Sequence, residues 1–353
     1  MTHILGIETS CDETAASVVK HPWRVLSSVV ASQVDIHAEY GGVVPEIASR
    51  HHAERILPVV KRAISDAGIS QGDVSVVAIG HRPGLIGCLL VGTSAAKSIA
   101  WSLGVPIVGV DHVHAHVLSG LLDQDTHEQL YPALGLVVSG GHTAMYVCTS
   151  STQMRRIGTT IDDALGEAYD KAATMLGLSY PGGPNLDTLA HSELAGPSGR
   201  NFPISRLSPD SLDFSFSGLK TALLYAIRGT PNRDGTFPRD FGDLIDRDRA
   251  ELAWAFQGAA VQAVILKLSR AHQQLREQGI NLRTLFVGGG VSSNSLLRVE
   301  LKLWADEHDL RLVIPPMRYC VDNAAMIAGL GGEMFGAGVA DDLSLRAHPQ
   351  SAY

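Results

Sequence analysis

The strongest indication of the fold is Ile4-Leu5-Gly6-Ile7-Glu8-Thr9-Ser10 together with the segment that follows it, Cys11-Asp12-Glu13-Thr14-Ala15-Ala16-Ser17-Val18-Val19. This pattern predicts an apolar strand, a short polar turn and a second apolar strand. The same pattern returns at residues 133–147, where Ser139-Gly140-Gly141-His142 forms the turn. Since each hairpin opens one large part of the chain, the repetition predicts a duplicated architecture of two lobes. A coincidence between two ordinary hairpins is the alternative.

Helical and strand-like segments alternate along the rest of the chain. Apolar residues at helical spacing predict a helix at 51–67, and an apolar run predicts a strand at 74–80. Further helices are expected at 93–103, 160–176, 217–228, 251–278, 292–308 and 321–335, and strands at 105–110, 282–287 and 310–314. The Pro-Gly-Gly-Pro stretch at 181–184 is expected to end a helix. Such alternation is typical of an α/β protein with helices on both faces of a mainly parallel or mixed sheet.

Composition excludes several classes of protein. The chain has 353 residues, 45% of them hydrophobic and 18% charged, which suits about two domains with well-buried cores. A net charge of −8 argues against a protein that binds nucleic acid by bulk electrostatics, although another subunit could supply a positive surface. The four scattered cysteines and the absence of an export signal predict a cytoplasmic location. No apolar run is expected to span a membrane.

Histidines follow the apolar strand that ends at Val110. If residues 111–122 are helical, His112 and His116 lie one above the other on one face, while His114 points elsewhere. Two imidazoles at this spacing can share a metal ion. A polar helix start with solvated histidines is the alternative.

A candidate third ligand comes much later in the chain. Asp322-Asn323 follows a strand and the double proline Pro315-Pro316, and an N-cap aspartate is the simpler interpretation. Two helical histidines and one distant carboxylate would leave metal positions open to a substrate, as catalytic zinc and non-haem iron sites do.

Two glycine turns are candidate phosphate sites. Ser139-Gly140-Gly141 and Gly288-Gly289-Gly290 both follow apolar strands, where backbone N–H groups can approach an anion without a Cβ in the way. Neither turn is a P-loop or a GxGxxG dinucleotide motif. The sequence favours a nucleotide held by two glycine loops from opposite lobes, with plain turns as the alternative.

Carboxylates are concentrated at 162–170. Asp163, Glu167 and Asp170 would share one helical face, where they could bind sugar hydroxyls or a cation, unless they are solvated surface acids. Covalent catalysis finds little support, since the chain has no GxSxG motif. A zinc protease is also disfavoured, because the segment at 127–131 lacks the second histidine of HExxH.

Together these segments resemble the family of tRNA N6-adenosine threonylcarbamoyltransferases, formerly named O-sialoglycoprotein endopeptidases. The resemblance follows the family's order along nearly the whole chain. The matching segments are residues 6–14, 42–51, His112 with His116, 138–143, 162–171, 180–184, 214–221, 289–291 with Asn294, and 320–323.

The resemblance implies a two-lobed fold like those of actin, sugar kinases and heat-shock ATPases, with duplicated mixed-sheet domains closing over a nucleotide. We expect one lobe at 1–132, with 320–345 packing back on it, and the other at 133–319. The implied reaction transfers the threonylcarbamoyl group from L-threonylcarbamoyl-adenylate to N6 of adenosine 37, in tRNAs that read codons starting with A. A non-catalytic scaffold subunit and an ATP-dependent sugar kinase of the same fold are the alternatives.

The resemblance also assigns roles to residues. It implies one divalent ion, Fe²⁺ or Zn²⁺, on His112, His116 and Asp322. It implies partner subunits as well, namely a non-catalytic paralogue and a small ATPase. We further expect that Asp12 or Glu13 assists deprotonation of the attacking amine. The implied substrate-binding residues are Val137, Val138, Ser139, Gly140, Gly141, Asp170, Gly183, Asp187 and Asn294.

The chain departs from the family's pattern in two places. Arg82 stands where the family usually has glycine before a Pro-Gly-Leu turn, which puts the local turn conformation in doubt. Asp111 stands where the family often has a histidine, and His114 where it has another residue. The second departure leaves the ligand pair intact.

Overall fold

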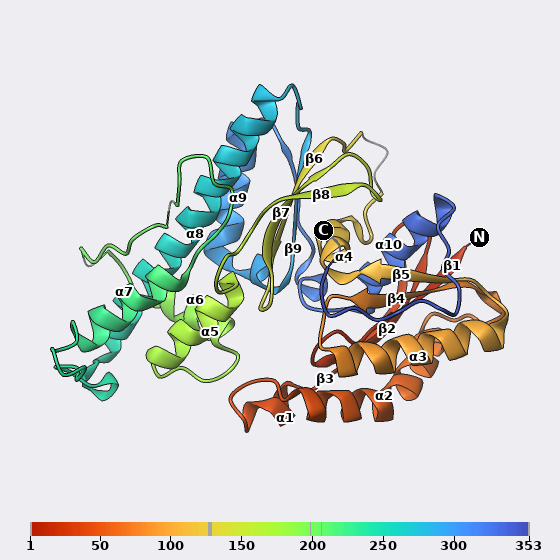
Figure 1. The fold of residues 1–353 in the computed structure, drawn as a ribbon, viewed down its shortest axis with the longest axis horizontal. Helices are drawn as coiled ribbons and strands as arrows, with labels where there is room; N and C mark the ends of the chain where they lie inside the picture. Colours follow the sequence, from red (N-terminus) through yellow and green to blue (C-terminus); the bar gives the residue numbers. More distant parts are fainter. Residues whose placement is uncertain (1, 126–128, 198, 206, 352–353) are drawn as a thin grey trace.

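A computed structural model describes residues 2–125, 129–197, 199–205 and 207–351, so part of the segment at 127–131 lies outside the described residues. Its first sheet has the strand order β3-β2-β1-β4-β5 (Figure 1). The central strand β1 pairs antiparallel with β2 and parallel with β4. The strands are β1 (His3–Glu8), β2 (Glu13–Lys20), β3 (Arg24–Ser32), β4 (Val74–Arg82) and β5 (Ile107–Asp111).

The second sheet repeats this arrangement, in the order β10-β9-β6-β7-β8. Here β6 pairs antiparallel with β7 and parallel with β9. In each sheet a hairpin and a third antiparallel strand precede two parallel strands that return through helices. The predicted duplication is therefore confirmed. The strands are β6 (Ala133–Val138), β7 (Thr143–Cys148), β8 (Met154–Thr159), β9 (Thr284–Gly288) and β10 (Arg311–Val313).

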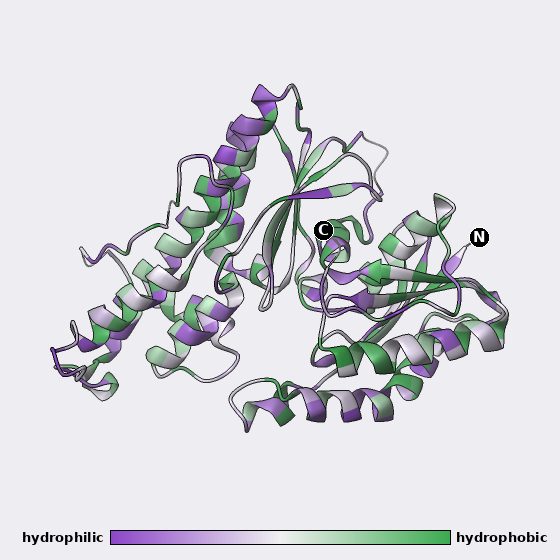
Figure 2. Cartoon of the chain, in the orientation of Figure 1, coloured by the Kyte–Doolittle hydropathy of each residue, from purple (hydrophilic) through white to green (hydrophobic). Residues whose placement is uncertain are grey.

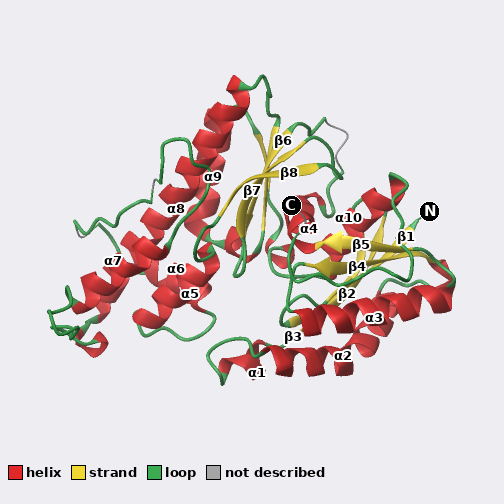
Figure 3. Ribbon diagram, in the orientation of Figure 1, coloured by secondary structure: helices red, strands yellow, loops and turns green. Residues whose placement is uncertain are grey.

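Helices cover both faces of the first sheet (Figure 3). On one face α2 and α3 pack against the strands and against each other, and α10 covers the other face. The short helix α4 contacts α10 as well as β6 and β9, so it lies between the two sheets. The elements are α1 (Val34–Ala38), α2 (Pro45–Asp66), η1 (Gln71–Asp73), α3 (Ile86–Leu103), α4 (His112–Leu118), η2 (Ser119–Leu121), η5 (Met317–Tyr319) and α10 (Ala324–Gly336).

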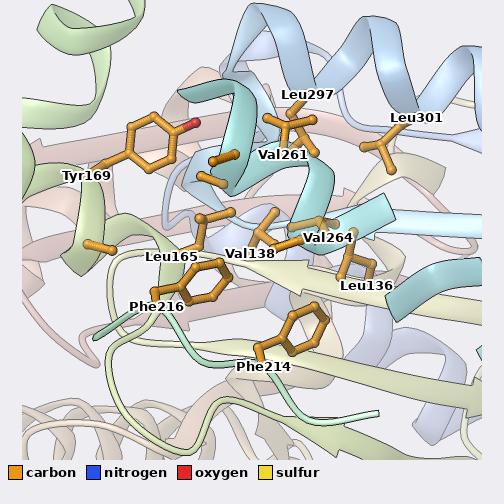
Figure 4. Packing of buried hydrophobic residues seen from close by; sticks show 14 of the residues in the cluster. Leu136, Val138, Leu165, Tyr169, Phe214, Phe216, Val261, Val264, Leu297 and Leu301 are labelled. Carbon is orange, nitrogen blue, oxygen red and sulfur yellow. The ribbon is translucent and has the colours of Figure 1, made fainter. Parts of the chain in front are cut away.

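The second sheet carries a larger helical layer. Side chains of β6, α5, α8 and α9 form its core together with Phe214 and Phe216, whose rings stack 6.2 Å apart (Figure 4). Burial of this apolar surface is the main contribution to the stability of the lobe. The elements are α5 (Leu165–Met175), α6 (Gly182–Ala190), α7 (Ser217–Arg228), η3 (Phe241–Asp243), α8 (Asp246–Glu277), η4 (Gly290–Ser293) and α9 (Ser295–Glu307).

Some expected element boundaries are wrong. The helix expected at 160–176 begins only at Leu165, and the stretch expected to end it starts a helix of its own, α6. Glycine and proline are tolerated in the first turn of a helix, because the N–H groups there have no intrahelical partner. The Asp170 carboxylate accepts hydrogen bonds from the backbone N–H groups of Gly182 and Gly183, at 3.0 and 3.2 Å.

The expectation that no segment could span a membrane needs correction. By length and composition alone, α3 and α8 are long and apolar enough. However, 67% of the apolar window of α8 is buried inside the protein, and α3 packs on β4. Figure 2 shows hydrophilic residues interspersed along both helices. The apolar character of α8 is therefore explained by its place in the core.

Candidate metal and substrate site

The histidine pair stands on α4, which begins directly where β5 ends. Asp111 caps this helix, because its Oδ1 accepts hydrogen bonds from the N–H groups of Val113 and His114. His112 and His116 follow at a spacing of one turn, and their rings lie 4.6 Å apart in an edge-on arrangement. Their side chains are almost fully buried, as the packing of α4 between the two sheets requires. His114 points away and packs edge-on against Tyr146, as predicted.

Asp322 lies opposite the histidine pair, just before α10. Its Oδ1 is 3.0 Å from His116 Nε2 and 3.6 Å from His112 Nε2. Asn323 caps α10 by accepting from the N–H of Met326, so the N-cap interpretation of Asp322 is wrong. The Asp322 side chain is 24% exposed, which leaves one side of the cluster open.

The donor set of this cluster suits a divalent transition metal. One ligand atom from each of His112, His116 and Asp322 lies within 4.8 Å of the others, and two imidazoles with one carboxylate match such an ion. His116 Nδ1 is buried without a hydrogen-bond partner among the described residues, so its Nε2 is the atom directed at the cluster. The residues present therefore fit a metal ion.

Charge and burial act in opposite directions on this cluster. Burial disfavours the charged form of His112, but the carboxylates of Glu8 and Asp322 outweigh it and raise its pKa to about 9. For His116 burial dominates and lowers the pKa. Desolvation opposes ionisation of Asp322, yet the neighbouring imidazoles lower its pKa. The cluster thus contains an ionised, largely enclosed carboxylate, and a bound cation would balance its negative charge.

The β6–β7 turn lies beside the end of β9, which approaches the backbone of His116 on α4. Ser139 N–H donates to the carbonyl oxygen of His142 at 2.7 Å, and the His142 N–H donates to Ser139 Oγ at 3.0 Å. Gly140 and Gly141 at the tip have open space where a Cβ would stand. The backbone of the turn is therefore accessible to a ligand, as the glycines predicted.

The two glycine turns come from one sheet, so the expectation of two opposite lobes is wrong. Strands β6 and β9 are parallel neighbours, and their carboxyl ends lie side by side. A Cβ on Gly289 would lie 2.4 Å from the carbonyl oxygen of Val138. Local patterns identify each turn, but only the pairing of β6 with β9 fixes their relation.

His142 is a site residue that the sequence reasoning missed. Its side chain is close enough to the cluster that, after burial, the charges of His112 and His116 are the next largest causes lowering its pKa, to about 4. The sequence signal that could have identified it is its position directly after Gly140-Gly141, in the turn predicted to bind phosphate.

The remaining predicted substrate residues take part in local structure. Asn294 caps α9 through the N–H of Leu297 and donates to Gln257 Oε1. Asp187 accepts hydrogen bonds from the N–H and the hydroxyl of Ser295. These contacts hold the start of α9 beside α6, near the β9 turn. Any ligand there would meet atoms that already have partners.

The shared acidic face expected at 162–170 does not form. Asp163 precedes α5 and forms ion pairs with Lys171 and Lys220, and Glu167 pairs with Lys171. Asp170 instead caps α6. These carboxylates therefore stabilise the packing of α5, α6 and α7.

Asp12 lies in the β1–β2 turn and Glu13 is the first residue of β2, so both belong to the first hairpin as expected. Asp12 is 9% exposed. Burial, and then the charges of Asp322 and Asp12, raise the pKa of Glu13 to about 10. Because the charge of Asp322 raises the pKa of Glu13, the first hairpin lies close enough to the cluster for their charges to interact.

A buried histidine holds this turn against α2 and makes stability depend on pH. His52 contacts the carbonyl oxygen of Cys11 through Nε2, at 2.9 Å, and Thr14 Oγ1 through Nδ1, at 2.8 Å. Burial lowers its pKa from the ordinary value of 6.5. The unfolded chain therefore takes up a proton below pH 6.5 that the folded chain resists, so stability falls as the pH drops through this range.

We expect His52→Gln to reduce this pH dependence. The wild type should lose up to about 1.4 kcal/mol more stability per pH unit than the variant between pH 6.5 and the lowered pKa. Urea unfolding of both proteins at pH 7.5 and 5.5 measures the difference. Equal losses in the two proteins would show that His52 does not titrate in this way.

The two departures from the family's pattern contact each other. Arg82 Nε lies 3.6 Å from Asp111 Oδ2, and Ser351 Oγ donates to the same oxygen at 2.5 Å. The chain before Ser351 runs along the edge strand β5, where Asp341 binds the N–H of Gly109 and the carbonyl of Ile107. Arg82 and the C-terminal segment thus hold the cap of α4 in place.

Replacement of Asp111 should separate its cap role from its ion pair. We expect Asp111→Ala to cost about 1–2 kcal/mol of stability, because two helix N–H groups lose their acceptor. Asp111→Asn should keep most of that stability, since asparagine caps equally well. Urea unfolding compares both with Asp342→Ala, an exposed turn residue whose loss should change little. An effect of Asp111→Ala no larger than that of Asp342→Ala would refute the cap role.

Comparisons with known proteins identify a family that matches most of the chain. The profile of the tRNA N6-adenosine threonylcarbamoyltransferase family matches residues 24–329. A protein of that name from Trichlorobacter lovleyi is 47% identical over 98% of this chain and 95% of its own. Another from Geobacillus kaustophilus is 45% identical over 98% of this chain and 96% of its own.

Among solved structures, HypF from T. kodakarensis matches 98% of this chain and 49% of its own, with a TM-score of 0.59 and 15% identity. The component A of (R)-2-hydroxyglutaryl-CoA dehydratase from Acidaminococcus fermentans matches 95% of this chain and 97% of its own, with a TM-score of 0.50 and 12% identity. At such identities the likeness concerns the fold alone, and it agrees with the expected two-lobed α/β architecture.

Proposed function

Because the chain belongs to the tRNA N6-adenosine threonylcarbamoyltransferase family, we propose that it modifies adenosine 37 of tRNAs that read codons starting with A. The threonylcarbamoyl group of L-threonylcarbamoyl-adenylate is transferred to N6, which yields N6-threonylcarbamoyladenosine and AMP. The observation that carries the proposal is the cluster of His112, His116 and Asp322 beside an open glycine turn, within a chain that matches the family over nearly its full length.

The reaction needs no enzyme nucleophile. The N6 lone pair forms a bond to the carbamoyl carbon, the bond from that carbon to the phosphate oxygen of AMP breaks, and N6 loses a proton. AMP is already an activated leaving group, so much of the acceleration comes from positioning. Asp12 takes the N6 proton in this scheme, because the raised pKa of Glu13 keeps that carboxyl protonated at neutral pH.

His112, His116 and Asp322 would hold one divalent ion, Fe²⁺ or Zn²⁺. When bound, such an ion supplies Lewis acidity and a fixed positive charge. The exposed part of Asp322 leaves room for the substrate on that side of the cluster.

The adenylate would lie along the β6–β7 turn. The N–H groups of Gly140 and Gly141 would bind the phosphate, because amides in such a turn bind anions, and the backbone from Val137 to Ser139 would line the site. Gly183, Asp170, Asp187 and Asn294 would complete the site toward α6 and α9. Asp187 and Asn294 then act mainly through the segments that they hold.

The lobes are proposed to be 1–132 with 320–345, and 133–319. Support comes from the two sheets and from α10, which packs on the first of them. We also propose a cytoplasmic location, in keeping with four free cysteines. Partner subunits, a non-catalytic paralogue and a small ATPase, would supply positive surface that a chain of net charge −8 lacks.

A reconstituted reaction tests the function. Purified protein receives threonylcarbamoyl-adenylate and a tRNA carrying adenosine 37, with and without the partner subunits, and digested nucleosides are identified by mass spectrometry. We expect threonylcarbamoyladenosine in the complete reaction and none with a tRNA carrying guanosine 37, which has no N6 amine. A scaffold would leave the product unchanged when this chain is omitted. Phosphorylation of a sugar by ATP without tRNA would instead favour a sugar kinase.

A further inference from the structure

The carboxylate of Glu8 is buried beside the cluster and has no role in the scheme above. Glu8 is the last residue of β1 in the centre of the first sheet, and it is fully buried. Burial of a charged group is costly unless the group is paired and hydrogen-bonded. Its contacts therefore need an explanation.

Both carboxylate oxygens of Glu8 have a donor. Oε1 accepts from the N–H of Ser10 at 2.5 Å, and Oε2 lies 3.0 Å from His112 Nδ1. An ionised carboxylate only accepts hydrogen bonds, so Nδ1 of His112 must carry the proton. The other ring nitrogen, Nε2, is the atom that faces Asp322, and in the neutral ring it carries the free lone pair.

The surrounding backbone leaves Glu8 little freedom. A Cβ on Gly80 of β4 would lie 2.4 Å from Glu8 Oε2, so a glycine there makes room for the carboxylate. Ser10 Oγ lies 3.3 Å from the same His112 Nδ1. By contrast, Nδ1 of His116 has no hydrogen-bond partner among the described residues. Only one histidine of the pair is oriented from behind by a carboxylate.

From this geometry we propose that Glu8 is a positioning residue that fixes the ring orientation and tautomer of His112 for metal binding. The inference rests on the proposed metal role of the cluster. Groups that orient a metal-binding histidine in this way usually contribute about ten- to a hundredfold to metal affinity. The role requires the carboxylate itself, because an amide of the same shape can donate to Nδ1 and favour the other tautomer.

The first measurement needs no metal. Long-range ¹H–¹⁵N NMR of the metal-free wild type, at a pH high enough for the His112 ring to be neutral, should show its single proton on Nδ1, through the contact with Glu8. In Glu8→Gln we expect the proton to move to Nε2. A wild-type spectrum with Nε2 protonated and Nδ1 bare would overturn the inference, whether or not the variant folds.

The second measurement uses Zn²⁺ as the probe. We expect isothermal titration to show a Kd about ten- to a hundredfold higher for Glu8→Gln than for the wild type. Glu333→Gln is a matched control, because Glu333 does not touch the cluster and its Oε1 instead lies 3.8 Å from His21 Nδ1. The Kd of this variant for Zn²⁺ should match that of the wild type. An unchanged Kd in a folded Glu8→Gln contradicts the inference. If the wild type binds no Zn²⁺, the metal proposal fails, while the tautomer measurement still decides the orienting contact.

Discussion

His116→Ala should abolish stoichiometric metal binding and slow threonylcarbamoyl transfer on the order of a hundredfold or more. Loss of a residue that merely orients a ligand costs about ten- to a hundredfold, and His116 is itself a candidate ligand. Its Nε2 lies 3.0 Å from Asp322, and its side chain is fully buried in a helix that the two sheets enclose.

Metal analysis and single-turnover transfer kinetics measure this effect. His114→Ala is the control, because His114 stands on the same helix but packs against Tyr146. The control should retain metal and transfer. A folded His116→Ala that keeps both would refute the assigned metal site.

Gly288→Ala should be the most destabilising of the glycine replacements at the site. An added Cβ would lie 1.8 Å from the carbonyl oxygen of His116, and backbone cannot move aside as a flexible side chain can. We expect a loss on the order of 3 kcal/mol, at the upper end of overpacking in a close-packed core, together with weaker metal binding as α4 shifts.

Gly290→Ala is the matched control two residues away, where a Cβ meets nothing within 4 Å. Urea unfolding should show a change of only a few tenths of a kcal/mol for this variant. Equal stabilities of the two variants would show that β9 and α4 do not approach as closely as described.

Local patterns were enough to predict the duplicated fold. Alternating apolar and polar segments define the two hairpins, and each lobe follows from its hairpin because later strands must pair beside it. The spacing of His112 and His116 likewise predicted a shared helical face. Both features depend on residues close together in the sequence.

The predictions that were wrong concern contacts between residues far apart in the sequence. The two glycine turns were expected in opposite lobes, whereas the parallel pairing of β6 with β9 brings them together. Asp163 and Glu167 looked available for a ligand, but Lys171 and Lys220 pair with them. Which partner a charged side chain finds depends on packing between helices, and no local pattern encodes it.

Asp322 makes another contact that sequence spacing alone could not determine. Its approach to His116 joins residues 206 positions apart, and sequence spacing alone left it as either a ligand or a helix cap. The family resemblance favoured the first, and the structure gives the cap to Asn323. Its role as a metal ligand remains a proposal.

The most direct test of metal-dependent transfer follows a labelled group through one turnover. Protein stripped of metal and then reloaded with Zn²⁺ or Fe²⁺ receives threonylcarbamoyl-adenylate labelled in the threonine moiety, tRNA with adenosine 37, and the partner subunits. The account predicts that label enters the tRNA with release of one AMP per group, in proportion to the metal restored. Full transfer by the metal-free protein, or no label in tRNA under any combination, would contradict it.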